Sequence, residues 1–141
     1  MSLSLTEFKK MYKDVIGDLK EVLDRTLRLG YAEEELDTTL FEDVREDEYE
    51  KEYNSIFHME IPTILKKALK EVGLTCSLYH LKDDVSMPEY VANCTTSNGI
   101  PIAASFEVIY EPLTGEIKLI HTSMDKGKEY PPSVLVYYHE V

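Results

Sequence analysis

The sequence has no tryptophan, two cysteines and six glycines in 141 residues, and these shortages limit the chemistry that it can support. A nucleophile elbow, a phosphate-binding loop and an EF-hand each require glycine at fixed positions beside a reactive or ligating residue, and none of the three patterns occurs. Neither Cys76 nor Cys94 has a CxxC partner, so the usual spacing of a zinc site is missing as well. We therefore predict no catalytic residue, no metal and no cofactor.

Long apolar runs are also missing. No stretch approaches the roughly 20 apolar residues that cross a bilayer, and the first residues lack the basic start and apolar run of a signal peptide. These features predict a cytoplasmic protein without a membrane partner. In that compartment Cys76 and Cys94 are expected to be reduced, partly buried thiols; a bridge between neighbouring strands is the first alternative and a metal site the second.

Positive charge is scarce, with 15 Lys and Arg against 27 Asp and Glu, a net charge of −12. Direct binding of nucleic acid needs clustered Lys and Arg, so this composition argues against it. Most of the excess lies in residues 33–52, the acidic segment, which holds eleven acids and two bases and so has a net charge of −9. Residues 1–32 and 53–141 contribute +1 and −4.

The chain has the length of a single domain, residues 1–141, with a helical half at 1–73 and a sheet at 74–141. Ser4 and Glu7 have the spacing of a capping box, and Gly30 stands where a helix commonly ends. Between them, apolar side chains recur every three or four residues, at Leu5, Phe8, Tyr12, Val15, Leu19, Val22 and Leu23. This pattern predicts a long amphipathic helix that packs on its own sheet, with a coiled-coil dimer as the alternative.

Two shorter helices are predicted in the rest of the helical half. Leu36, Leu40 and Val44 are spaced for a short helix, whose positive end would favour residues 33–35. For residues 42–52, a helix and a loop stay open as alternatives. Pro62 is a good first-turn residue for a further helix that ends at Gly73. Its outer face carries three lysines that are candidates to pair with the acidic segment: Lys66, Lys67 and Lys70.

The clearest structural signal is a hairpin. Residues 104–110 alternate apolar and polar side chains, residues 111–115 supply proline and glycine for a turn, and residues 117–123 alternate again. Further strands are predicted at 75–81, 90–95 and 134–141, with loops at 83–88 and 97–99. Five strands with short connections favour a mostly antiparallel sheet. The predicted fold class is therefore α+β, with N-terminal helices packed on a C-terminal five-stranded sheet.

Histidines on predicted strands are the candidates for a metal site. His80, His121 and His139 would form one if they met on one face of the sheet beside a cysteine. A lone histidine on a strand is more often a surface or hydrogen-bonded residue. We therefore predict that no metal is bound.

A pocket on the concave face of the sheet is the alternative to a binding surface. Tyrosines would line it, and His121, Tyr110 and His139 would be its polar groups, in a small-molecule-binding protein or an enzyme. Asp83 and Asp84 would act as acid and base only if they were buried together.

The acidic segment is the candidate binding surface. Its carboxylates would form an electrostatic docking face for a basic protein, standing in for phosphates in a nucleic-acid-binding groove, and Tyr49 and Tyr53 would add rigid aromatic contact area. In size and charge the chain resembles small acidic α+β inhibitors such as immunity proteins and anti-CRISPR proteins. This favours a non-enzymatic inhibitor or adaptor; a merely solvated surface, and a homodimer through the first helix or the last strand, are the alternatives. The predicted partner-binding residues are Glu42, Asp43, Glu46, Asp47, Glu48, Tyr49, Glu50, Glu52 and Tyr53.

Overall fold

The computed structural model describes residues 5–82 and 89–141, and the side chains from residue 10 onward within those ranges. Two predictions therefore lie outside the described part: the capping box of Ser4 and Glu7, and the loop that holds Asp83 and Asp84. None of the helices in the described ranges is both long enough and apolar enough to cross a membrane.

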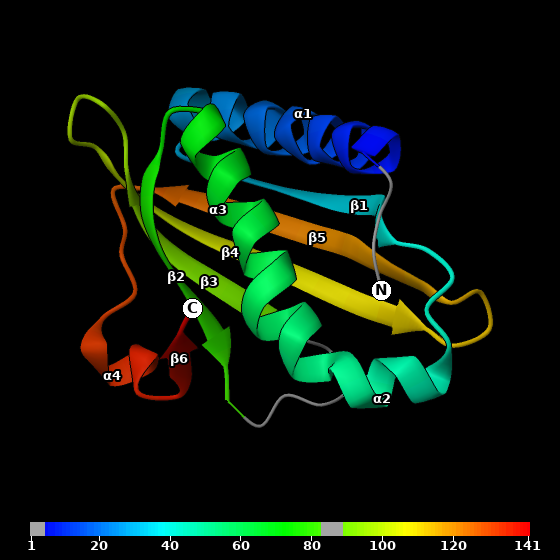
Figure 1. The fold of residues 1–141 in the computed structure, drawn as a ribbon. Helices are drawn as coiled ribbons and strands as arrows, with labels where there is room; N and C mark the ends of the chain where they lie inside the picture. The colour runs from blue at the N-terminus through cyan, green and yellow to red at the C-terminus, as the bar shows by residue number, and fades with distance from the viewer. Residues whose placement is uncertain (1–4, 83–88) are drawn as a thin grey trace.

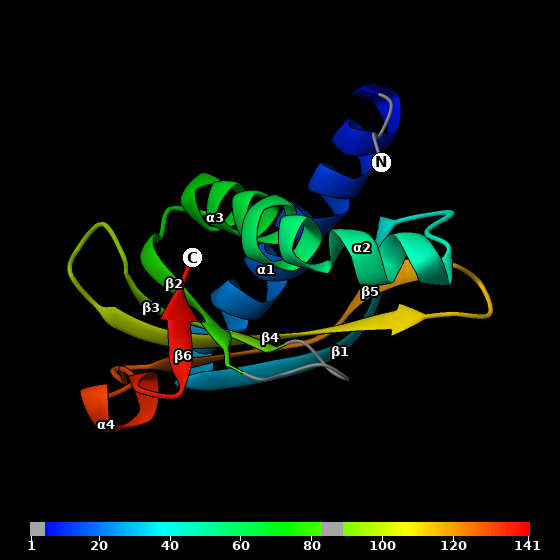
Figure 2. The same cartoon turned by 60° about the horizontal axis from the view of Figure 1, so that its bottom comes forward.

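Helices and strands form two layers, with α1 and α3 on one face of a single sheet (Figures 1 and 2). The broad α+β class is thereby confirmed. The elements are α1 (Leu5–Leu29), β1 (Tyr31–Phe41), α2 (Glu46–Ser55), the π-helix η1 (Ile56–Glu60), α3 (Ile61–Glu71), β2 (Thr75–Leu81), β3 (Glu89–Thr95), β4 (Pro101–Glu111), β5 (Glu116–Lys126), α4 (Pro132–Leu135) and β6 (Tyr138–Glu140).

The strand order is β1-β5-β4-β3-β2-β6, and neighbouring strands run antiparallel. The predicted hairpin is confirmed as β4 and β5, in which Tyr110 pairs with Ile117 and Glu111 with Glu116. Gly115 closes the turn with a φ of 72°, a conformation that a side chain would resist. This hairpin occupies the middle of the sheet and gives β1 an edge on which to pair.

The described sheet has six strands, so the prediction of five is wrong. The missed strand is β1, for which a short helix was expected. A spacing of four residues, as between Leu36 and Leu40, fits one face of a helix and also one face of a strand, because four is a multiple of two. Pairing with the open edge of β5, where Ala32 lies opposite Met124 and Thr38 opposite Leu119, decides the outcome in favour of a strand.

The end of the chain also differs from the prediction. A strand was expected over 134–141, but the structure has the short helix α4 followed by the three-residue strand β6, in which His139 lies opposite His80. Pro131 and Pro132 explain the change, because proline is well suited to the first turn of a helix and cannot donate to a strand ladder.

From Glu46 to Glu71 the backbone is helical without a break, passing from α2 through η1 into α3. Pro62 lies in the first turn of α3, as predicted, although α3 continues the helical backbone of α2 and η1. Proline removes a backbone donor, and the π-helical turn η1 lies immediately before the first turn of α3 that contains it.

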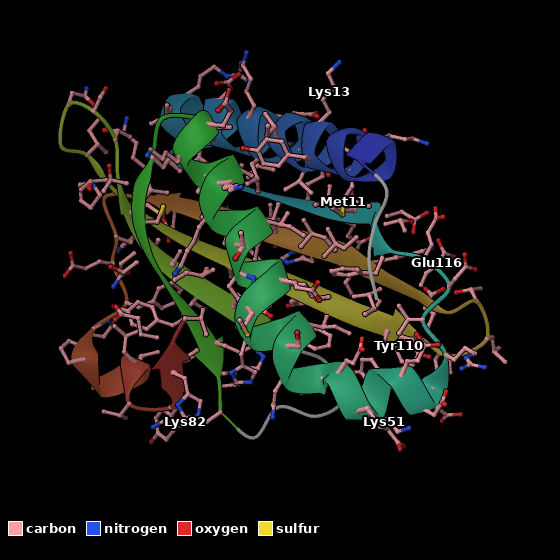
Figure 3. All side chains as sticks on the ribbon, viewed as in Figure 1. Met11, Lys13, Lys51, Lys82, Tyr110 and Glu116 are labelled. Atoms are coloured by element: carbon pink, nitrogen blue, oxygen red, sulfur yellow. A yellow bond between two sulfur atoms is a disulfide. The ribbon has the colours of Figure 1, made fainter. Side chains whose placement is uncertain are left out.

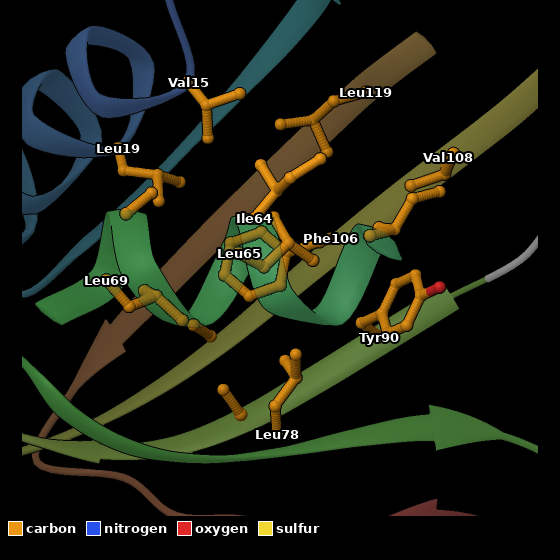
Figure 4. Close-up of a cluster of buried hydrophobic side chains, with 14 of the residues drawn as sticks. Val15, Leu19, Ile64, Leu65, Leu69, Leu78, Tyr90, Phe106, Val108 and Leu119 are labelled. Carbon is orange, nitrogen blue, oxygen red and sulfur yellow. The ribbon is translucent and has the colours of Figure 1, made fainter. Parts of the chain in front are cut away.

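The hydrophobic core lies between the helices and the sheet (Figure 4). Val15 and Leu19 from α1 and Leu65 from α3 are fully buried against the strands. Tyr90 belongs to the same core, and its hydroxyl donates to the backbone oxygen of Phe57 at 2.5 Å. A buried tyrosine hydroxyl needs such a partner, so this bond fixes η1 over β3.

Cys76 and Cys94 form a disulfide, so the expectation of two free thiols is wrong. The register of β2 and β3 places the two residues directly opposite each other, with a Cα–Cα distance of 4.0 Å. The sequence alone does not define that register, which is why the bridge between neighbouring strands was only an alternative.

Removing this disulfide should destabilise the protein. Its two ends are 18 residues apart, and closing a loop of that size is worth about 3 kcal/mol through the entropy of the unfolded chain. We expect Cys76→Ser with Cys94→Ser to lower the free energy of unfolding by roughly this amount in urea titrations. Adding reductant should destabilise the natural protein to the same extent and leave the double variant unchanged; equal stability of the two proteins without reductant would contradict the prediction.

Candidate functional site

An acidic surface is formed by the loop after β1 and by α2. It comprises Glu42, Asp43, Glu46, Asp47, Glu48, Glu50 and Glu52. All of these residues are exposed except Glu48 and Glu52, which are half-buried. Residues 42–52 hold seven acids and two bases, a net charge of −5. Arg45 lies among them and pairs with Glu48 at 2.8 Å and with Asp47 at 3.9 Å.

The aromatic residues of α2 turn toward the protein. Tyr49 stacks on Tyr110 of β4 with ring centroids 3.9 Å apart and an interplanar angle of 9°, and it meets Phe57 edge to face. Tyr53 also packs on Phe57, at 4.6 Å. Both α2 tyrosines are half-buried. Their contacts hold α2 on the sheet and leave the carboxylates on its outward side.

The loop before α2 is fixed by the turn of the central hairpin. Val44 is fully buried, its N–H donates to the oxygen of Gly115 at 2.8 Å, and its own oxygen accepts from the Tyr110 hydroxyl at 2.7 Å. Burial, followed by the nearby carboxylates of α2, raises the pKa of Tyr110 and keeps its hydroxyl protonated as a donor. In Figure 3, Tyr110 lies beside α2, whereas Lys51 points away from the sheet.

The first part of the acidic segment belongs to a different environment. Strand β1 carries it, and three of its four carboxylates pair within the protein. Glu34 meets Arg25 at 3.2 Å, and Glu33 meets the His121 ring at 3.3 Å. Asp37 pairs at 2.9 Å with Lys118 of β5, which also approaches Glu111 and Glu116. The structure thus divides the segment into an internally paired strand and an outward-facing loop and helix.

Three histidines converge at the β6 edge of the sheet, but they are not the set considered from the sequence. His80 and His139 lie opposite each other, and His58 of η1 replaces His121, which lies on the other face. His80 is almost fully buried with no hydrogen-bond partner on either ring nitrogen. Burial, with smaller effects of His58 and His139, lowers its pKa to about 4. Within the described ranges, no group of three or more metal-binding side chains is placed to hold an ion.

The residues expected around a concave-face pocket do not meet. Tyr110 points toward α2, His121 contacts Glu33 and Glu107 on the opposite face, and His139 lies on β6. A hollow of about 710 Å³ lies instead between α1 and β1, and sequence reasoning missed it. Gly17 could have indicated this hollow from the sequence, because a glycine inside a helix lowers its stability by about 1 kcal/mol relative to alanine.

Comparisons with protein-family models, with curated proteins and with solved structures found no match. The acidic surface, the tyrosine contacts beneath it and the histidine cluster are therefore interpreted from their own chemistry.

A methyl group at Gly115 should loosen the acidic surface. Its Cβ would lie 3.1 Å from the oxygen and 3.2 Å from the nitrogen of Val44, at a φ of 72°. Gly127 is a matched control, because its φ is 77° but a Cβ there meets nothing within 4 Å. We expect each alanine variant to lose roughly 1–2 kcal/mol of stability through backbone strain. Gly115→Ala should lose more and should also speed amide hydrogen exchange in α2; equal exchange rates in the two variants would contradict this.

His80 should make the protein acid-sensitive. Its pKa is about 4 in the folded protein and about 6.5 in an unfolded chain, so the unfolded chain takes up the proton first as the pH falls. The stability contributed by neutral, buried His80 is complete above pH 6.5 and is lost progressively toward pH 4, by up to about 3 kcal/mol. Urea titrations from pH 8 to 4 should show this slope, and His80→Leu should flatten it. An identical slope in both proteins would assign the acid sensitivity to other groups.

Proposed function

We propose that the protein is a non-enzymatic binding protein, an inhibitor or adaptor, that docks a basic protein partner through the acidic surface. A nucleic-acid-binding groove of another protein is the partner surface that fits best, because carboxylates at helical spacing can replace phosphates there. Direct binding of nucleic acid is not part of the proposal, since the acidic surface would repel phosphates.

The observation that supports the proposal most is the anchored, outward display of carboxylates that outnumber the cations among them, seven acids to two bases over residues 42–52. Glu46, Asp47 and Glu50 are exposed on α2, while the loop before them is anchored at Val44. Anchored charges need little ordering when a partner binds, and a concentrated negative potential accelerates the encounter with a positive surface.

We propose a different role for the two tyrosines from the one predicted. Because Tyr49 and Tyr53 pack on Tyr110 and Phe57, we propose that they position α2, while the carboxylates make the contacts with the partner. Binding energy would then come from charge pairs at the surface, and the association rate should depend strongly on salt.

The proposal also concerns the compartment in which the protein works. Cytoplasmic location was predicted from the sequence, and the Cys76–Cys94 disulfide favours an oxidising environment instead, because cytosolic thiols are normally kept reduced.

Homodimerisation stays an alternative function, with β1 and β6 as the two edge strands of the described sheet.

Neutralising the acidic surface should slow association with the partner. The variant carries Glu46→Gln, Asp47→Asn and Glu50→Gln, which changes the net charge from −12 to −9. A partner is first captured at low salt from a lysate of the cells that encode the chain, released at high salt, and identified by mass spectrometry. With the purified partner, stopped-flow measurements should show an association rate at least about tenfold lower for the variant.

The matched control has the same net charge but neutralises exposed acids elsewhere, with Glu21→Gln on α1, Glu71→Gln on α3 and Glu129→Gln after β5. It should associate nearly as fast as the natural protein. If both triple variants slow association equally, overall charge and not this surface guides the encounter. If capture is insensitive to salt, the electrostatic proposal is wrong.

A further inference from the structure

The hollow between α1 and β1 is a groove along an edge strand. Its walls come from the first half of α1 and the second half of β1, and Glu42 closes one end. Figure 2 shows that α1 tilts away from the strands toward its N-terminal end, which opens the groove, and Figure 3 shows Met11 pointing from α1 toward β1. Met11 and Leu40 are buried at its base, so the groove has an apolar floor.

Gly17 forms part of the helical wall of this groove. It lies in the interior of α1, where glycine is among the least favourable residues. A Cβ at this position would meet nothing within 4 Å, so packing within the protein does not require a glycine. What the missing side chain does provide is space for a second chain to lie close to the helix.

The opposite wall is a strand with a free edge. β1 stands first in the strand order, and no strand in the described part of the chain pairs with its outer side. The four residues Asp37–Leu40 border the groove, and in this stretch the register of β1 against β5 shifts between Glu35 and Thr38 and again between Thr39 and Phe41. An exposed edge of this kind is where extended peptides are added to a sheet, with main-chain hydrogen bonds providing affinity.

The charged side chains that line the groove indicate which kind of peptide would bind there. Four acids line the groove, Asp14, Asp18, Asp37 and Glu42, together with the cations Lys10 and Lys13; Asp37 already pairs with Lys118, and in Figure 3 Lys13 extends away from the strands. Asp18 is the most confined of these acids: it accepts a 2.5 Å hydrogen bond from Thr38, and its burial, together with Glu34, Asp14 and Glu21, raises its pKa. A lysine or arginine placed beside it would relieve this crowding of negative charge.

A second copy of the same chain fits the edge poorly. Glu33, Glu35 and Asp37 are exposed along β1, and pairing two β1 strands would bring these like charges together across the new ladder. Of these residues, Glu33 and Asp37 already contact His121 and Lys118, so Glu35 is the one whose charge would attract a positively charged strand.

We propose that the groove between α1 and β1 binds an extended, lysine- or arginine-rich segment of a partner protein, which adds to the sheet as a seventh strand beside β1. This inference rests on the proposed function, because it assumes the same basic partner. It adds a second contact with that partner, which begins at Glu42, the first residue of the acidic surface. The partner segment would lie against the helix at Gly17 and place its basic side chains near Asp14 and Asp18.

The test uses a defined probe, an eight-residue peptide of alternating lysine and threonine with blocked ends. Titration into the labelled protein, followed by amide NMR and fluorescence anisotropy, should shift signals of β1 and of α1 around Gly17. Gly17→Phe fills the groove and should weaken binding at least tenfold. Thr63→Phe, which puts the same neutral ring on the exposed face of α3, should leave binding unchanged. Because alanine and phenylalanine are both better helix formers than glycine, neither Gly17→Ala nor Gly17→Phe should lower the unfolding midpoint.

Two further peptides separate charge from strand pairing. Replacing lysine with glutamate should abolish binding, and methylating alternate backbone nitrogens should abolish it while the charge is kept. Signals that shift only in α2, with binding unaffected by Gly17→Phe, would overturn the groove and leave the proposed function standing. The groove proposal would also be overturned if the glutamate peptide bound equally well, or if the protein formed a dimer that Gly17→Phe disrupts. The association kinetics with the partner test the acidic surface independently of this experiment.

Discussion

The pairing of β1 with β5 is the contact on which the rest of the arrangement depends. It returns the chain from α1 along the edge of the sheet, so that α1 lies over the strands and one side of β1 is left free. It also delivers the following loop to the turn of the central hairpin, where Val44 bonds to Gly115 and Tyr110. Both the groove and the acidic surface are therefore products of one strand pairing.

The parts of the fold that the sequence predicts are those with an unambiguous local period. The hairpin of β4 and β5 alternates over many residues and has proline and glycine between its arms, and α1 keeps its apolar stripe for most of its length. β1 fails this criterion because Leu36 and Leu40 satisfy two periods at once, and the choice is made by β5, more than 75 residues further along the chain. The disulfide could not be predicted for a similar reason, since it depends on the register between β2 and β3.

The candidate site was predictable in its charge but not in its geometry. The exposure of Glu46, Asp47 and Glu50 follows from the high cost of burying unpaired carboxylates. The direction of Tyr49 and Tyr53 does not follow from composition, because a half-buried tyrosine suits an interface and a core margin equally well. The positions of Tyr110 and Phe57 against α2 decide that the rings turn inward. The division of the acidic segment into paired and outward-facing parts likewise depends on cations that lie elsewhere in the chain, above all Arg25 and Lys118.

Helix α2 is an element that its own sequence does little to stabilise. It has no fully buried residue, and Glu46 and Glu50, like Glu48 and Glu52, stand four residues apart with like charges. The acids of its first turn suit the positive end of the helix dipole, but Glu50 and Glu52 lie beyond that benefit. Its order comes from the tyrosine contacts and from its continuity with η1 and α3. A basic partner would remove the repulsion that α2 carries alone. Binding and the stability of α2 are then linked, and a ligand that prefers the ordered helix stabilises it by an amount that grows with the logarithm of the ligand concentration relative to Kd.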